Sequence, residues 1–159
     1  MKKLFSLSLT TGILCGIWIL IGNALNIPTW IGFAGCTAFF AAGGCSDNGV
    51  PKALFSTLSG VLWAVVIFQL SNYFPGEYSS ATLTAIVTFI MCIQGGLKLF
   101  AFIPGTFIGS FSTFAAGGHW EQVIPGLILG VALGFLCDYS GTKLDSVVTI
   151  KSDSKNSVT

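Results

Sequence analysis

Two of the long uncharged stretches of this chain carry small side chains that form hydrogen bonds along their length. The first stretch carries Cys36 and Thr37, and the second carries Thr106, Ser110, Ser112 and Thr113. Gln69 and Gln94 are the uncharged polar side chains that cost most to place in lipid. Such groups bind a small neutral solute or join neighbouring helices, and the sequence leaves both open. No charged residue lies clearly at the middle of a stretch, so no proton relay is predicted.

The composition places these groups in a membrane protein. Only 8% of the residues are charged and 53% are hydrophobic, whereas a soluble domain carries about 25% charged residues. The mean hydropathy is +0.83. Seven lysines, no arginine and six acidic residues supply no basic patch, so nucleic acid is excluded as a partner and the lipid bilayer is expected instead.

Charged residues and turn residues divide the chain into six predicted transmembrane helices. One crossing takes about 20 apolar residues, and helices satisfy the backbone polar groups in lipid. The helices are predicted at about 4–25, 30–43, 52–72, 79–96, 99–116 and 122–140. The fold class is therefore all-α membrane, with one domain over 1–141 and a polar cytoplasmic tail, 142–159, expected to be disordered.

The lysines set the expected orientation, because cytoplasmic loops are enriched in Lys and Arg. With six spans and both termini cytoplasmic, all seven lysines fall on the cytoplasmic side, and the opposite loops hold Glu77, His119 and Glu121. A cleaved signal peptide is the alternative interpretation of the first segment, although its apolar run is longer than a signal sequence needs.

The sequence matches itself at an offset of 74 positions. Phe33 aligns with Phe107, Gly35 with Gly109, and 40–44 with 114–118, so that seven of the twelve positions from 33 to 44 are identical. Because each half holds three spans, the second half crosses in the opposite sense, which predicts a 3+3 inverted repeat with halves of about 1–74 and 75–141. A chance match in a Gly-, Ala- and Phe-rich chain is the alternative.

Inverted repeats often place a solute site on short or broken helices near the bilayer midplane. The second and fifth helices are the short, glycine-rich pair. The candidate solute-pathway residues are Gly35, Thr37, Phe40, Gln94, Gly109, Ser110, Thr113 and Phe114, with His119 and Glu121 at the outer mouth. The alternative is that the small residues only allow helices to pack closely.

Other patterns indicate structure rather than chemistry. Small residues recur every four positions at 12 and 16, at 56, 60 and 64, and at 126, 130 and 134, which is typical of packed membrane helices. Trp18 and Trp63 lie deep in their spans and need a partner for the indole N–H. The five cysteines show no Cys-x-x-Cys spacing. With no catalytic motif, the sequence predicts no enzyme, no metal and no cofactor.

Five strings carry a family resemblance: Thr10–Leu14, Gly32–Ala38, Leu58–Ala64, Met91–Gln94 and Pro104–Gly109. They resemble the YcdZ-like family of small bacterial inner-membrane proteins, DUF1097, and the similarity covers nearly all of the spans. The resemblance implies a protein of the bacterial cytoplasmic membrane. That family has no established activity, so it implies no functional residue.

Two functions follow as hypotheses. The first is a channel or facilitator for a small solute, based on the repeat and the two short helices. The second is a non-transporting membrane subunit or scaffold that oligomerises or binds a partner through glycine-striped helices. A homo-oligomer is expected under either, because the chain is small. A polar path bordered by the second and fifth helices would favour the first, and a dry core filled by Phe40, Phe114 and Trp63 the second.

Overall fold

The uncharged stretches fold as α-helices. A computed structural model describes residues 2–45, 48–74 and 76–156. Its helices are α1 (Lys2–Ala24), α2 (Thr29–Ala41), α3 (Gly49–Tyr73), α4 (Glu77–Ile93), α5 (Ile103–Ala115) and α6 (Trp120–Asn156), and a short 3-10 helix, η1 (Gln94–Gly96), directly follows α4. The prediction of an all-α fold with six helices is confirmed.

The helices fall into two length classes. Four stretches of the described residues are long and apolar enough to cross a bilayer: Leu4–Ala24, Gly49–Tyr73, Glu77–Gly96 and Trp120–Val148. By contrast, α2 and α5 have 13 residues each. They measure about 20 Å at 1.5 Å per residue, which is less than the hydrocarbon core of about 30 Å. The structure thus gives four long candidate spans and two short helices.

Two predicted boundaries were wrong. We expected the fifth helix to begin near 99, but α5 begins at Ile103, where Pro104 suits a first helical turn because it needs no backbone N–H donor there. We expected the sixth helix to end near 140, but α6 continues to Asn156, so the tail expected to be disordered is helical from 142 to 156. The point where this extension begins lies beside α1: a Cβ on Gly141 would lie 2.9 Å from the Leu7 Cα. Residues 157–159 of the tail lie outside the described residues.

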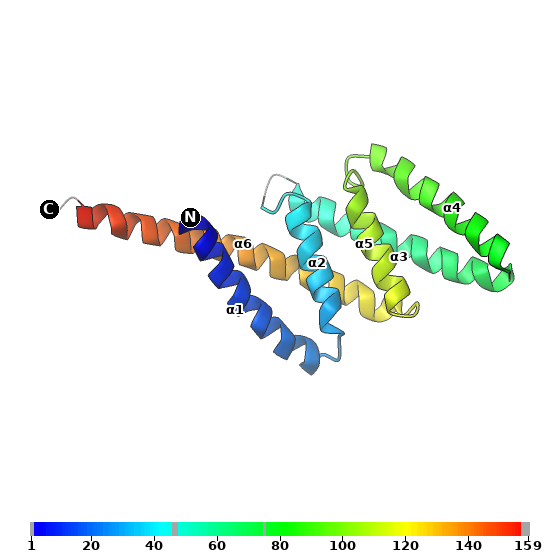
Figure 1. The fold of residues 1–159 in the computed structure, drawn as a ribbon, viewed down its shortest axis with the longest axis horizontal. Coiled ribbons are helices and arrows are strands. Elements are labelled where there is room, and N and C mark those ends of the chain that lie inside the picture. The colour runs from blue at the N-terminus through cyan, green and yellow to red at the C-terminus, as the bar shows by residue number, and fades with distance from the viewer. Residues whose placement is uncertain (1, 46–47, 75, 157–159) are drawn as a thin grey trace.

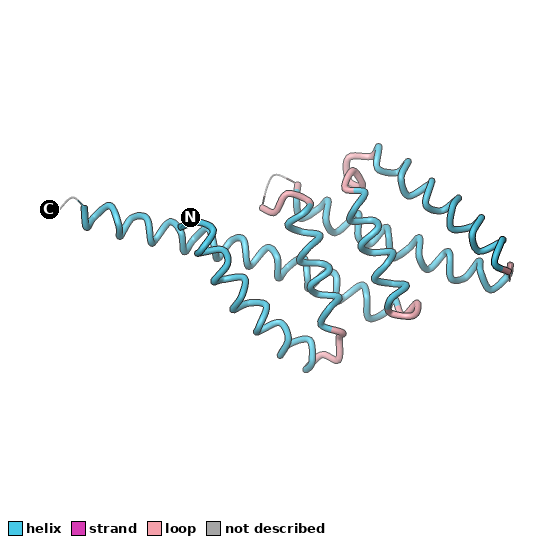
Figure 2. The backbone as a smooth tube through the Cα atoms, in the orientation of Figure 1, coloured by secondary structure: helices cyan, strands magenta, loops and turns pink. Residues whose placement is uncertain are grey.

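Figure 1 shows how the helices are arranged. The short helices cross the long ones, and α2 packs chiefly on α6 while α5 packs chiefly on α3. The helix α1 also packs on α6, whereas α4 lies at the opposite edge against α3. In the tube view, the loops at 25–28 and 116–119 lie at the lower side and those at 42–45 and 97–102 at the upper side (Figure 2). These four loops thus lie on two opposite sides of the molecule.

Glycines bring the crossing helices into backbone contact. A Cβ on Gly35 of α2 would collide with the Leu127 carbonyl oxygen of α6 and lie 3.1 Å from the Val131 nitrogen. A Cβ on Gly109 of α5 would collide with the Thr57 carbonyl oxygen of α3. Because a side chain fits at neither position, each joint depends on its glycine.

The two short helices also correspond in position and in their ends. The bounds of α5, 103 and 115, each lie 74 positions after those of α2, 29 and 41. After α2, the backbone N–H of 42 donates to the carbonyl of 38, that of 43 to 40, and that of 44 to 39. After α5, the same three bonds recur 74 positions later, from 116 to 112, from 117 to 114 and from 118 to 113. Gly43, Gly44, Gly117 and Gly118 all have positive φ, a conformation that glycine adopts readily.

Candidate functional site

The predicted pathway residues on α2 and α5 fall into two groups. Gly35 and Gly109 are buried in the joints described above. Thr37 is exposed, and so are Phe40 and Phe114, with 37% and 42% of their surface accessible. Phe114 packs against Phe68 at 5.1 Å between ring centroids. The structure uses the glycines for close packing and turns the two phenylalanines outward.

The buried hydroxyls of α5 also pack within the bundle. Thr113 is fully buried and donates its hydroxyl to the Gly109 carbonyl, one turn back, at 2.9 Å. Ser110 is 7% exposed, and Ser112 Oγ is buried without a hydrogen-bond partner among the described residues. His119 and Glu121 lie exposed beside the turn between α5 and α6. The pathway role of these residues stays a prediction.

Gln94 lies at a hydrogen-bonded cluster that joins three helices. It is the first residue of η1, which tightens the chain directly after α4. Its Oε1 accepts from the Trp63 indole nitrogen at 2.9 Å and from the Ser59 hydroxyl at 3.0 Å, both on α3. Its Nε2 donates to Ser59 Oγ at 2.8 Å and to Thr106 Oγ1 of α5 at 3.4 Å. We name Gln94, Ser59, Trp63 and Thr106 the Gln94 cluster.

The partners of Gln94 fix the orientation of its side-chain amide. An indole N–H only donates, so Trp63 requires the oxygen of the Gln94 amide on its side and turns the amide nitrogen toward Thr106. The expected need of Trp63 for a partner is thereby met. The sequence had singled out Gln94 and Thr106, but it missed Ser59, because a serine in an apolar helix is a weak signal without its neighbours.

A cavity of about 370 Å³ lies against the Gln94 cluster. Its lining combines three members of the cluster with apolar side chains: Phe55, Leu58, Ser59, Leu62, Trp63, Gln94 and Phe100. Phe55 and Phe100 meet edge to face with ring centroids 6.5 Å apart. The arrangement suits a small molecule that exchanges a few hydrogen bonds with an amide and a hydroxyl while its remainder touches apolar groups.

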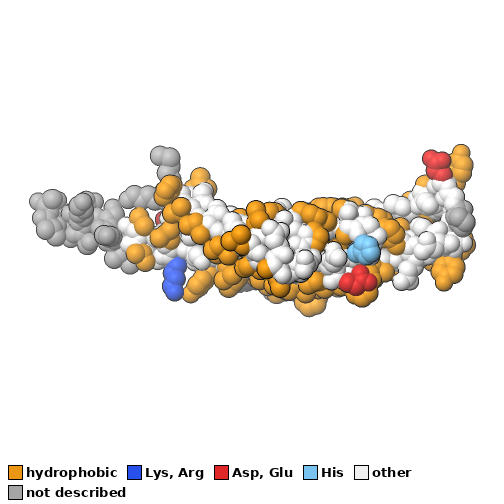
Figure 3. All heavy atoms as spheres, turned by 90° about the horizontal axis from the view of Figure 1, so that it is seen from below, with side chains coloured by type: hydrophobic (Ala, Val, Ile, Leu, Met, Phe, Trp, Pro, Cys, Tyr) orange, Lys and Arg blue, Asp and Glu red, His pale blue; other side chains and the backbone are white. Residues whose placement is uncertain are grey.

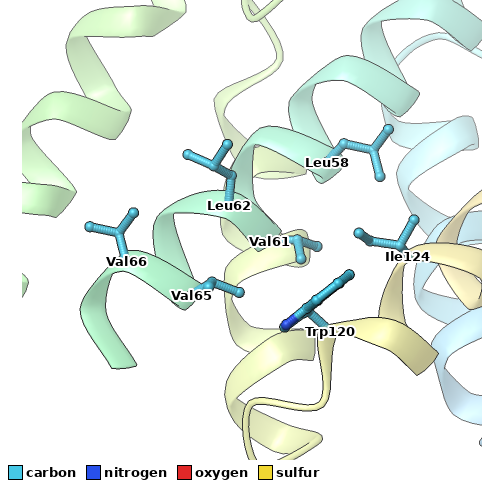
Figure 4. Close-up of a pocket in the computed structure, with 7 residues that line it drawn as sticks. All are labelled: Leu58, Val61, Leu62, Val65, Val66, Trp120 and Ile124. Atoms are coloured by element: carbon cyan, nitrogen blue, oxygen red, sulfur yellow. The ribbon is translucent and has the colours of Figure 1, made fainter. Parts of the chain in front are cut away.

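A second cavity, of about 400 Å³, is apolar. Figure 4 shows Val61 and Val65 of α3 opposite Trp120 and Ile124 of α6. Leu58 and Leu62 line both this cavity and the one at the Gln94 cluster. The two hollows are therefore neighbours along α3.

The described part of the chain offers few titratable side chains that could bind a ligand or a metal ion. Among the described residues, no group of three His, Cys, Asp or Glu side chains converges as a metal site would. Figure 3 shows hydrophobic side chains over the middle of one face, with acidic groups and the histidine toward one end and a lysine toward the other. In the loop after α2, desolvation first and then the hydrogen bond and charge of Asp138 raise the pKa of the Cys45 thiol.

Comparisons with known proteins place the chain. The model of the family described as a protein of unknown function, DUF1097, matches residues 8–142. This chain belongs to the DUF1097 family. It is 44% identical to inner membrane protein YcdZ of Escherichia coli K12 over 142 residues, which cover 89% of this chain and 87% of the relative.

Two further relatives agree with this assignment. Inner membrane protein YcdZ of Salmonella typhimurium LT2 is 45% identical over 150 residues, covering 92% of each chain. Uncharacterized protein YahC of E. coli K12 is 29% identical over 165 residues, covering 94% of this chain and 97% of the relative. No solved structure matches. With its long apolar helices, this DUF1097 member is a multi-pass protein of the inner membrane.

Proposed function

We propose that the protein is a facilitator, or channel, for a small neutral solute, and that the Gln94 cluster is its hydrogen-bonding site. One observation carries the proposal: an amide, a hydroxyl and an indole from α3 and η1 converge on a cavity of about 370 Å³ in an otherwise apolar region. These groups are half-buried, and polar groups within membrane helices are costly and often mark a solute path. Catalysis has no part in this function.

The cavities suggest where the path runs. Lys52, Phe55, Ser59, Leu62 and Val66 are spaced three or four residues apart on α3, so they follow one helical face. Each lines at least one of three cavities along that face, and Leu62 lines two of them. The path in this proposal follows α3 past Gln94 and replaces the one expected between α2 and α5. An oligomer would close its open side.

The inverted repeat is a second part of the proposal. Its support is the exchange of partners: α2 packs on α6 and α5 on α3. The contact of Gly35 with Val131 corresponds, at an offset of 74 positions, to the contact of Gly109 with Thr57. Two halves of about 1–74 and 75–141, related by an axis in the membrane plane, would produce this exchange.

The proposed orientation has both termini and the 142–159 tail in the cytoplasm. Lys52 lies near the start of α3 and Lys98 in the connection between α4 and α5, and both line one cavity. The loop that holds His119 and leads to Glu121 lies on the opposite side from the 42–45 and 97–102 loops (Figure 2), and Glu77 is the first residue of α4. This distribution fits an excess of lysine in cytoplasmic loops.

Solute flux into proteoliposomes tests the function. Glycerol, urea and small weak acids are screened by stopped-flow light scattering with the wild-type protein, Gln94→Met and Thr113→Val. We expect Gln94→Met to lower flux at least tenfold, because an apolar side chain cannot replace the amide. Thr113→Val, which removes a hydroxyl bonded only within its own helix, should leave flux unchanged. Flux no higher than in empty liposomes for every solute, or equal flux through Gln94→Met, would overturn the proposal.

A second candidate function is self-association as a non-transporting subunit. A Cβ on Gly12 or Gly16 of α1 would meet nothing within 4 Å, whereas Gly126, Gly130 and Gly134 of α6 all face α2. An open stripe of this kind is typical of helices that dimerise in membranes. Energy transfer between labelled copies in liposomes tests it: Gly12→Leu with Gly16→Leu should abolish the signal, and Ile13→Phe, exposed beside the stripe, should preserve it.

A further inference from the structure

The connection between α4 and α5 and the start of α3 enclose a basic cavity of about 490 Å³. Its lining consists of Asn48, Lys52, Lys98, Leu99 and Ala101. None of the described residues in this lining is acidic. The two lysines come from segments 46 positions apart (98 minus 52), and their shared cavity concentrates positive charge at one point of the surface.

The start of α3 adds to this positive potential. Asn48 precedes Gly49, the first residue of a 25-residue helix, and no side chain among the described residues caps that end. The first amides of a helix point outward and carry partial positive charge. Lys52, one turn into α3, is half-buried, and Lys98 is exposed. An anion in the cavity would therefore meet two ammonium groups and a helix N-terminus.

The neighbouring surface is apolar. Leu99 and Ala101 line the basic cavity, and Phe100 between them lines the next cavity along α3 together with Phe55 and Leu58. A free anion makes no use of such a surface. A molecule with an anionic head and an acyl chain would use both parts, because its chain would cover the aromatic pair while its head reached the lysines.

We propose that the Lys52–Lys98 cavity binds the phosphate of an anionic phospholipid headgroup, with an acyl chain lying along α3 over Phe55 and Phe100. This lipid site does not rest on the proposed transport function, but its acyl chain and the solute would compete for the cavity that Phe55 and Phe100 line. It places the connection between α4 and α5 at the headgroup layer of the leaflet that the lysines face. The lipid would hold that connection against the start of α3.

Thermal melts of the full-length protein in detergent test the site. Tryptophan fluorescence is followed while short-chain phosphatidylglycerol, phosphatidylcholine or sodium phosphate is added. A ligand that binds only the folded state raises Tm in proportion to its saturation. We expect phosphatidylglycerol to raise Tm by several degrees and phosphatidylcholine to raise it far less.

Matched variants locate the effect. Lys52→Gln and Lys98→Gln should each weaken the apparent affinity for phosphatidylglycerol about fivefold, since one lysine near the membrane surface is worth about 1 kcal/mol. Lys143→Gln removes a lysine on α6 outside this lining and should bind as the wild type does. Lys52→Arg with Lys98→Arg should retain binding.

Three results would overturn the lipid site. They are an equal shift for phosphatidylcholine, an unchanged affinity in the Lys52→Gln and Lys98→Gln variants, and an equal loss in Lys143→Gln. A shift reproduced in full by sodium phosphate would assign the cavity to free phosphate and also overturn the lipid proposal. Flux through the Gln94 cluster is measured separately, so the two proposals fail independently.

Discussion

The helices α1 and α4 each begin a run of three helices, but they are attached to the molecule by different means. Trp18 of α1 is 3% exposed, lies over Gly32 of α2 and donates its indole N–H to the Thr29 carbonyl at 2.8 Å. Only Val87 and Met91 of α4 are buried, and the polar contacts of its end come from Gln94. The packing of Trp18 on Gly32, which we name the Trp18 interlock, thus fixes α1. A hydrogen-bonded cluster beside a cavity holds the end of α4.

We infer that the contact of α1 with α2 serves stability, whereas the contacts at the end of α4 serve the proposed function. A large aromatic side chain seated on a glycine leaves no space for a solute and fixes the angle between two helices. An amide between two helices keeps hydrogen-bonding groups at a cavity wall and can exchange partners with a ligand. The half that holds α4 is therefore the half in which we place the proposed solute site.

Removing the interlock should have the largest effect on stability. Trp18→Ala leaves a cavity above Gly32 and removes the indole hydrogen bond to the Thr29 carbonyl, so we expect a loss of about 4 kcal/mol. Cys92 lies 74 positions later and is exposed on α4, so Cys92→Ala should change stability by less than about 0.5 kcal/mol. Reversible unfolding in mixed detergent measures both. Similar losses would erase the contrast between α1 and α4.

The glycine joints should be alike where α1 and α4 differ. A Cβ at Gly35 or Gly109 would collide with a carbonyl oxygen of the facing helix, so Gly35→Ala and Gly109→Ala should each cost about 3 kcal/mol. Gly16→Ala, in open space, serves as the control and should not destabilise the protein. The same unfolding assay applies. A large loss at only one of the two joints would contradict the proposed repeat.

The fold could be predicted further than the site. Charge breaks and apolar length gave six helices, because lipid makes a charged residue within a span costly. The extension of α6 to Asn156 could not be predicted from its polar sequence, which lacks the apolar length of a span. The Gln94 cluster could be predicted only in part: an indole and an amide within membrane spans each need a partner, but the sequence does not show that these two meet. The way in which the helices cross brings the indole and the amide together. That crossing depends on glycines, and the sequence does not show which helix each glycine contacts.

The smallest predicted effect concerns the turns that follow the two short helices. Both turns have the same hydrogen bonds, but only in the first does the backbone of Cys45 donate to a carboxylate, that of Asp138 on α6, at 2.9 Å. Asp138 also raises the pKa of the Cys45 thiol, after desolvation. A raised thiol pKa means less thiolate at a given pH and slower alkylation.

Asp138→Asn should therefore lower the pKa of the Cys45 thiol and speed its reaction with iodoacetamide between about pH 7 and 8.5. The difference in rate should vanish at a pH where the Cys45 thiol is ionised in both the wild type and the variant. Mass spectrometry of the peptide around Cys45 measures the rate, and Cys92, far from Asp138 along the chain, is the internal control. A slower reaction in Asp138→Asn would contradict this prediction. It would mean that the carboxylate makes the Cys45 thiol more accessible, so that the turns after α2 and α5 differ in shape as well as in charge.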